Sequence, residues 1–186
     1  MSFANKITIF RILSVPFLIT TLVYYTPQKD YLRLIALFIF ALAIISDAID
    51  GYFARVRNQK TQAGAILDPL ADKFLLITAF IFLYHISNQY FDIKLPLWVI
   101  LIVIFRDVIL LLGGGIIILT NQENKIMPTW WGKTSTFFQM MTILFLLLKL
   151  NLSYYIWNIA VIFTLISGID YLRKGIVMFN AQPQKK

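Results

Sequence analysis

Long apolar runs separated by short polar or charged stretches dominate this chain. Six such runs occupy residues 7–25, 32–49, 70–86, 95–120, 130–150 and 154–177. Each is close to the length of about 17–25 residues with which an α-helix crosses the hydrocarbon core of a bilayer. The pattern therefore predicts an all-α, polytopic membrane protein with six transmembrane helices, organised as a single membrane domain over residues 1–186.

Basic residues gather at alternate ends of these runs. The net charge is +8, from 17 Lys and Arg against 9 Asp and Glu. Eleven basic residues lie near the two termini or between alternate runs, and four lie in the other connections: Lys29, Arg33, Lys94 and Lys149. Because cytosolic connections are enriched in Lys and Arg, we expect both termini on the cytosolic face of the cytoplasmic membrane. The positive charge then faces anionic lipid, and we expect no nucleic-acid partner.

Composition narrows the possible chemistry. Hydrophobic residues make up 59% of the chain and charged residues 14%, against about 45–50% and about 25% in an ordinary soluble domain. There is no cysteine and one histidine, His85. Disulfide frameworks, cysteine nucleophiles and multi-histidine zinc sites are therefore excluded.

Four of the nine acidic residues stand close together between the second and third runs. Asp47 and Asp50 are three residues apart, and Asp68 and Asp72 are four apart. Both spacings place the two side chains on one face of a helix. Four converging carboxylates repel one another unless cations lie between them, and Mg²⁺ or Mn²⁺ are the natural occupants of an oxygen-ligand site. We therefore expect two divalent ions here, placed to clamp a pyrophosphate.

Small residues accompany the acids. Gly51 and Ala54 follow the first pair, and Gly64 lies one turn before Asp68, so that a ligand can approach the helix backbone. Arg55 adds a cation that can hold phosphate oxygens through two hydrogen bonds.

The acids have two other interpretations. In the first, they are structural and are balanced by nearby basic residues, namely Arg55, Arg57, Lys60 and Lys73. In the second, they bind the coupling ion of a transporter. Acids inside a membrane segment are functional by default, which disfavours the first. The cluster lies at one membrane face and not at mid-membrane, which disfavours the second.

The segment reads Asp47-x-x-Asp50-Gly51-x-x-Ala54-Arg55, eight residues, then Gly64-x-x-x-Asp68-x-x-x-Asp72. It resembles the signature of the CDP-alcohol phosphotransferases at every position. The resemblance implies six transmembrane helices, often a homodimer, and transfer of a phosphatidyl or similar group from a CDP-linked donor to an alcohol, with release of CMP.

The same resemblance implies roles for individual residues. Asp47, Asp50, Asp68 and Asp72 would hold the two ions, and Asp72 would also be the general base for the acceptor hydroxyl. The residues that would line the CDP pocket are Gly51, Ala54, Arg55 and Gly64.

Charges in the fourth and fifth runs indicate the acceptor side. Arg106 and Asp107 interrupt an apolar run, where charges usually mark a site. We expect Arg106 to bind a phosphate on the acceptor; the alternative is an ion pair that stabilises helix packing. Lys133 could bind the same phosphate together with Thr134, Ser135 and Thr136, or could extend to the membrane interface.

Further motifs are similar to the bacterial phosphatidylglycerophosphate synthases within this family. These are N-K-I-T-I-F-R at the start, G-K in the fifth run and S-G-I-D-Y-x-x-K-G in the sixth. The similarity implies CDP-diacylglycerol as donor and sn-glycerol 3-phosphate as acceptor. It also implies that Asn5, Thr8 and Arg11 flank the nucleotide.

Two positions depart from that subfamily. Ser135 stands where a second lysine is common, and Asp107 stands where glutamate is common. R-D-V in the fourth run and P-T-x-x-x-K-x-x-T-x-x-Q in the fifth are similar instead to eukaryotic-type cardiolipin synthases, whose acceptor is phosphatidylglycerol. On the match in the sixth run we favour glycerol 3-phosphate and keep phosphatidylglycerol as the alternative.

Overall fold

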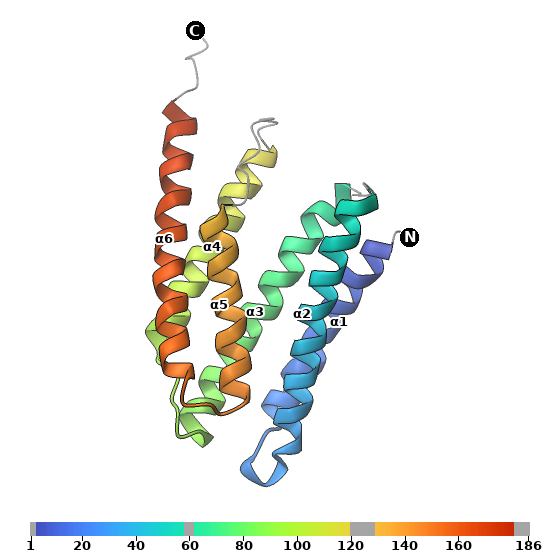
Figure 1. Cartoon of the computed structure of the whole chain (residues 1–186), viewed down its shortest axis with the longest axis vertical. Coiled ribbons are helices and arrows are strands. Elements are labelled where there is room, and N and C mark those ends of the chain that lie inside the picture. Colours follow the sequence, from blue (N-terminus) through green and yellow to red (C-terminus); the bar gives the residue numbers. More distant parts are fainter. Residues whose placement is uncertain (1–2, 58–61, 120–128, 181–186) are drawn as a thin grey trace.

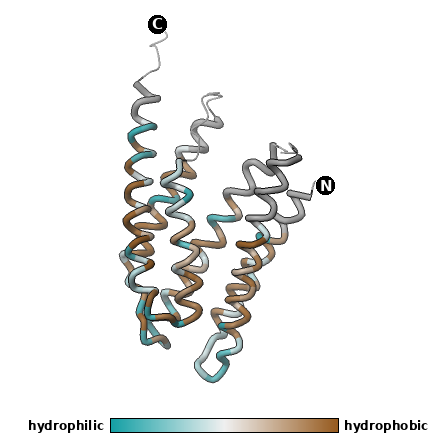
Figure 2. Tube along the Cα trace, viewed as in Figure 1, coloured by the Kyte–Doolittle hydropathy of each residue, from teal (hydrophilic) through white to brown (hydrophobic). Residues whose placement is uncertain are grey.

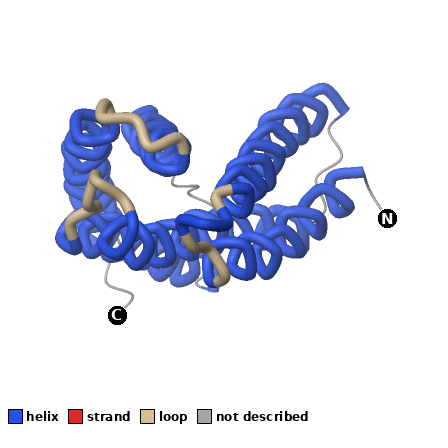
Figure 3. Tube along the Cα trace, turned by 90° about the horizontal axis from the view of Figure 1, so that it is seen from below, coloured by secondary structure: helices blue, strands red, loops and turns tan. Residues whose placement is uncertain are grey.

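The computed structural model describes residues 3–57, 62–119 and 129–180, with side chains placed for 10–46, 70–113 and 129–175. The regular secondary structure in these ranges is helical, without a strand (Figure 3). A short 3₁₀ turn, η1 (Pro27–Lys29), follows the first helix. The six α-helices are α1 (Phe3–Val23), α2 (Tyr31–Arg57), α3 (Gln62–Tyr90), α4 (Leu97–Leu119), α5 (Trp130–Leu147) and α6 (Ser153–Asn180).

The six predicted helices are confirmed, and α2 and α3 extend furthest beyond the apolar runs. Helix α2 continues to Arg57, and α3 begins at Gln62. Hydropathy marks only the part of a helix that is apolar enough for lipid, whereas the backbone hydrogen bonds continue through the polar turns beyond it. Both carboxylate pairs therefore lie on helical backbone, as their spacing requires.

The outer surface of the bundle is strongly apolar. Large exposed side chains occur on every helix, among them Phe17, Phe38, Phe74, Phe105, Phe137 and Ile162, and apolar residues dominate the middle of the helices in Figure 2. By length and composition, Leu70–Tyr90 in α3 and Ser153–Gly175 in α6 could each cross a bilayer. Apolar surface of this extent is typical of a protein embedded in lipid.

Successive helices run in opposite directions. The start of α1, the end of α2, the start of α3 and the end of α6 therefore share one end of the bundle (Figure 1). The connections after α1, α3 and α5 share the other end, and they carry or adjoin the four basic residues predicted for the less basic side: Lys29, Arg33, Lys94 and Lys149. The predicted separation of basic residues between the two ends agrees with this arrangement.

The helices form two groups that meet along a shared core. Helix α1 packs on α2 and α3, α6 packs on α4 and α5, and α3 and α5 contact members of the opposite group. Phe40, Phe80, Val99 and Ile143 come from four different helices and are fully buried in this core. Since lipid is as apolar as these side chains, close packing rather than exclusion of water favours their burial in a membrane.

At the end opposite the termini, ionic and aromatic contacts tie three connections together. Asp30, after α1, binds Arg33 at 2.6 Å and Lys149, after α5, at 3.1 Å. The Lys149 ammonium also lies 5.8 Å from the ring centre of Tyr25 and 5.2 Å from that of Phe91. We call this group of five residues the loop clasp.

The charge of the loop clasp is insensitive to ordinary changes of pH. The hydrogen bond from Arg33, and then that from Lys149, hold the pKa of Asp30 well below its usual range. A lowered carboxyl pKa contributes stability that is present above the unfolded pKa of about 4 and is lost as the pH falls through the folded value. On the acid side, the clasp therefore weakens only in strong acid.

Lys149 also ends α5 in an unusual backbone conformation. Its φ is 55°, in the left-handed region that favours glycine. Its N–H donates to the Leu146 carbonyl at 2.9 Å, and the Leu150 N–H donates to the Phe145 carbonyl at 3.0 Å. This is the Schellman arrangement, which normally places glycine at the position of Lys149. The contacts of its side chain in the loop clasp offset the backbone strain.

We predict that Lys149→Ala destabilises the protein more than Lys149→Gly does. Both variants lose the side-chain contacts, but alanine keeps the left-handed strain, which costs about 1–2 kcal/mol. The free energy of unfolding, measured by chemical unfolding in detergent, should therefore be about 1 kcal/mol higher for the Gly variant than for the Ala variant. Equal stabilities would show that the backbone at this position is not strained.

Candidate active site

The four predicted metal ligands lie on two helices that approach the same end of the bundle. Asp47 and Asp50 occupy roughly the last three turns of α2, and Asp68 and Asp72 occupy roughly the first three turns of α3. Of these four side chains the structure describes only that of Asp72. The other site residues whose side chains lie outside the described ranges are Asn5, Thr8, Gly51, Ala54, Arg55 and Gly64, and their roles stay predictions.

Asp72 pairs with Arg11. The Arg11 Nη1 donates to Asp72 Oδ1, joining α1 to α3. The Arg11 side chain is 1% exposed, whereas that of Asp72 is 26% exposed. The structure thus brings together the predicted base and a residue predicted to flank the nucleotide. A guanidinium has five N–H donors, so that it can serve more than one acceptor at once.

A second ionic network joins α3, α4 and α6. Asp107 is fully buried, and its Oδ1 accepts from Lys73 Nζ and from Arg106 Nη1, both at 2.7 Å. The Arg106 Nη2 donates to Ser167 Oγ, also at 2.7 Å. The ion pair weighed as an alternative for Arg106 and Asp107 is therefore present. It has a third member, Lys73.

The start of α5 packs closely against the same guanidinium. A Cβ on Gly132 would lie 3.1 Å from Arg106 Nη2 and 3.5 Å from Ser167 Oγ. Thr129 caps α5 by accepting a hydrogen bond from the Gly132 N–H at 3.2 Å. The missing side chain at Gly132 is what allows α5 to approach Arg106 this closely.

The structure does not gather the hydroxyls of Thr134, Ser135 and Thr136 around Lys133, which was one of the two alternatives for this lysine. The Lys133 side chain is exposed. Thr134 and Thr136 donate to helix carbonyls one turn back, at 3.0 and 3.1 Å. Ser135 is fully buried and bonds to Thr164 at 2.8 Å, linking α5 to α6. Because successive residues of a helix point about 100° apart, neighbours in sequence face different surroundings.

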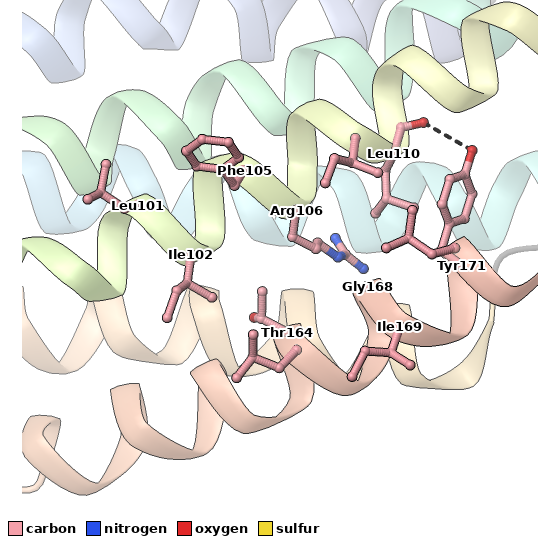
Figure 4. A pocket seen from close by; sticks show the side chains of 12 residues that line it. Leu101, Ile102, Phe105, Arg106, Leu110, Thr164, Gly168, Ile169 and Tyr171 are labelled. Atoms are coloured by element: carbon pink, nitrogen blue, oxygen red, sulfur yellow. Dashed lines mark hydrogen bonds between the residues drawn. The ribbon is translucent and has the colours of Figure 1, made fainter. Parts of the chain in front are cut away.

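A pocket of about 300 Å³ lies between α4 and α6 (Figure 4). Its walls are mostly apolar and include Phe105 and Leu165, which are also exposed on the outer surface, while Arg106 forms part of one wall. Tyr171 packs over Gly113 beside it and donates to the Leu110 carbonyl at 3.5 Å. The lining suits an apolar chain and not a nucleotide, so that the nucleotide is expected elsewhere, by α2 and α3.

No cluster of three or more His, Asp or Glu side chains occurs within the ranges where side chains are described. Three of the four predicted ligands lie outside those ranges, so that this observation leaves the predicted metal site untested.

The sequence profile of the CDP-alcohol phosphatidyltransferases matches residues 1–166. The chain belongs to the CDP-alcohol phosphatidyltransferase family. The family indicated by the resemblance of the acidic motif is therefore confirmed.

Relatives within the CDP-alcohol phosphatidyltransferases align along most of their length. A probable phosphatidylglycerophosphate synthase of Mycobacterium tuberculosis is 31% identical over 178 residues, covering 93% of this chain and 81% of the relative. A CDP-diacylglycerol–glycerol-3-phosphate 3-phosphatidyltransferase of Haemophilus influenzae is 32% identical over 183 residues, covering 95% of both chains. An enzyme of the same name from Blochmanniella floridana is 30% identical and covers 78% of this chain and 73% of the relative.

Three residues of this CDP-alcohol phosphatidyltransferase take part in the network although the sequence did not single them out for it. The sequence indicates Lys73 only as a counter-ion for the acids, and it indicates no separate role for Ser167 or Gly132. A signal existed for Lys73, because a cation near the start of an apolar run requires a partner in the membrane. Nothing in the sequence identified that partner as Asp107.

We predict opposite effects of alanine at two glycines beside Arg106. Gly132→Ala would press on a guanidinium that is held by two hydrogen bonds, and overpacking of this kind costs about 1–3 kcal/mol. A Cβ at Gly168 would meet only the Arg106 Cγ, at an ordinary 3.7 Å, and alanine favours the helix by about 0.5–1 kcal/mol. The free energy of unfolding, measured by chemical unfolding in detergent, should therefore be higher than that of the parent in Gly168→Ala and lower in Gly132→Ala. The reverse order would mean that the Arg106 guanidinium moves away from the added methyl group at little cost in free energy.

Proposed function

We propose that this protein transfers the phosphatidyl group of CDP-diacylglycerol to the primary hydroxyl of sn-glycerol 3-phosphate, giving phosphatidylglycerophosphate and CMP. The observation that carries the proposal is the alignment of relatives named for this reaction over 93–95% of the chain. That alignment includes the helices that bear the acceptor-side charges as well as those that bear the acids.

The charge around Arg106 supports an acceptor that carries a phosphate. Lys73 and Arg106 bring two positive charges to the single carboxylate of Asp107, so that the network carries one net positive charge in a buried place. A phosphate group would balance that charge, whereas an alcohol without one would not. Arg106 and the exposed Lys133 are the residues assigned to the acceptor phosphate.

Asp72 and the arginines carry the proposed chemistry. Asp72 takes the proton of the acceptor hydroxyl, and the oxygen attacks the β-phosphorus of the donor. The bond from that phosphorus to the CMP oxygen breaks, and CMP leaves. Arg11, which is already bonded to Asp72, and Arg55 hold phosphate oxygens of the nucleotide.

Two Mg²⁺ or Mn²⁺ ions fit the donor set proposed for them. Asp47, Asp50, Asp68 and Asp72 supply only oxygen ligands, and they stand on helical backbone three and four residues apart. When bound, such ions would offset negative charge on the pyrophosphate and on the leaving CMP.

The proposed setting is the cytoplasmic membrane. All six helices cross it, both termini and the active site lie at its cytosolic face, and the enzyme is a homodimer. Support for the orientation comes from the position of the start of α1, the end of α6 and both carboxylate segments at one end of the bundle, the end predicted to be more basic (Figure 1). The exposed apolar side chains on every helix support six crossings.

Phosphatidylglycerol as acceptor, as in the eukaryotic-type cardiolipin synthases, is the second candidate. It is favoured by Ser135, which is buried in the contact between α5 and α6 where a second phosphate-binding lysine would otherwise stand. Phosphatidylglycerol also carries a phosphate and a primary hydroxyl, so that Arg106 and Lys133 would keep their roles. The acceptor itself must therefore be tested.

We predict that the purified protein in detergent, given CDP-diacylglycerol and Mg²⁺ or Mn²⁺, releases CMP in proportion to added glycerol 3-phosphate. Phosphatidylglycerol and inositol phosphate are tested in parallel. Release only with phosphatidylglycerol would replace the leading proposal by the second candidate. Absence of release with every acceptor, together with cation-coupled flux in sealed vesicles, would instead indicate a transporter.

We predict that Asp72→Asn lowers kcat by about 10²–10⁴-fold, because an amide cannot accept the proton. CDP-diacylglycerol should still raise the melting temperature of this variant. Asp47→Asn and Asp68→Asn should abolish turnover through loss of the metal ions. The matched control is Asp92→Asn, an exposed residue after α3 at the far end of the bundle, which should keep the parent rate. A normal rate for Asp72→Asn would remove it as the base.

A further inference from the structure

Consecutive residues of α3 contact the two halves of the proposed site. Asp72 pairs with Arg11 of α1, and Lys73 binds Asp107 of α4. This divergence follows from the helix, in which neighbouring side chains point about 100° apart. A single turn of α3 therefore connects the proposed base with the arginine proposed to bind the acceptor.

The bond from Lys73 to Asp107 determines how much of the carboxylate charge acts on Arg106 and how the carboxylate is oriented toward it. Lys73 and Arg106 share one carboxylate oxygen of Asp107, at 2.7 Å each. The other oxygen, Oδ2, is buried and has no hydrogen-bond partner among the described residues. Without Lys73, the full negative charge of Asp107 would fall on Arg106, and the carboxylate could turn to bind the guanidinium through both oxygens.

The orientation of Arg106 depends on the same bond. Its two terminal nitrogens are held by Asp107 and by Ser167, and Gly132 lies against the second of them. A guanidinium is a planar group, so that rotation of either partner changes the direction in which its remaining N–H groups point. Lys73 and Arg106 together hold Asp107 through the same carboxylate oxygen.

We propose that Lys73 is a positioning residue for the acceptor: through Asp107 it orients Arg106 and keeps the positive charge of Arg106 available to a phosphate. This inference rests on the proposed function, since it assigns Arg106 to the acceptor. Lys73 itself does not touch the substrate. Its removal is expected to weaken acceptor binding and to spare the donor.

The test is the steady-state kinetics of CMP release by the detergent-purified protein with CDP-diacylglycerol and glycerol 3-phosphate. Lys73→Met should raise the acceptor KM about tenfold or more, while the donor KM and kcat change by less than about threefold. Lys73→Arg keeps the positive charge and the N–H groups that can bind Asp107. This variant should therefore restore the acceptor KM to within about threefold of the parent. Lys73→Gln serves in place of the Met variant if the latter does not fold.

Lys149→Met is the matched control. It also removes a lysine that is bound to an aspartate, but in the loop clasp at the opposite end of the bundle. It should leave both KM values unchanged. A rise in the acceptor KM of this variant comparable to that of Lys73→Met would show a general effect of lost ion pairs and would overturn the inference.

A double-mutant cycle tests whether Lys73 acts through Asp107. In an Asp107→Asn background, Lys73→Met should add less than about a threefold further change in the acceptor KM, because the connecting carboxylate charge is already absent. Fully multiplicative effects of the two substitutions, or equal changes of donor and acceptor KM in Lys73→Met alone, would overturn the inference and leave the proposed function standing.

Failure of the proposed function gives a different result. If the parent protein releases CMP with phosphatidylglycerol and not with glycerol 3-phosphate, the acceptor assignment is wrong, and the same variants are then compared with phosphatidylglycerol. An acceptor-specific effect of Lys73→Met there would support the role of Lys73. If neither phosphate-bearing alcohol supports release by the parent, both the proposed function and the inference fail.

Discussion

The carboxylate of Asp107 neutralises part of the positive charge that Lys73 and Arg106 bring into the apolar interior of the bundle. A buried ion without a partner costs several kcal/mol even after the surroundings relax. Arg106 is 7% exposed and Lys73 is 14% exposed, and Asp107 supplies the carboxylate to which both cations bind. The contact between α3 and α4, and the approach of α5 and α6 to Arg106, are all arranged around this one acidic group.

The periodicity and length of the apolar runs were sufficient to predict six helices and their alternating direction. They did not predict the ends of α2 and α3, because helical hydrogen bonding continues into polar residues that hydropathy assigns to a connection. The spacing of the acids placed Asp47 with Asp50, and Asp68 with Asp72, on helical backbone. The resemblance of the whole motif to the family signature led to the family assignment, which the match over residues 1–166 confirms.

The ionic partners were harder to predict, for a physical reason. The pair formed by Arg106 and Asp107 could be weighed from the sequence because the two residues are adjacent. The bonds from Lys73 to Asp107, from Arg11 to Asp72 and from Arg106 to Ser167 depend on how whole helices pack. Ser135 shows the same limit: its neighbours in sequence suggested a phosphate pocket, whereas the rotation of α5 turns it into the contact with α6.

The ionic contacts differ in how much of the chain each one spans, and this bears on the order in which they can form during synthesis. Lys73 and Asp107 are 34 residues apart, so that they can pair as soon as α4 has emerged. The bond between Arg106 and Ser167 spans 61 residues and must wait for α6. Lys149 and Asp30 are 119 residues apart. Since a growing chain folds from its N-terminus, the first loop can gain its contact with Lys149 only after the fifth helix has been made, so that the loop clasp is completed after the pairing of Lys73 with Asp107 and before α6 reaches Arg106.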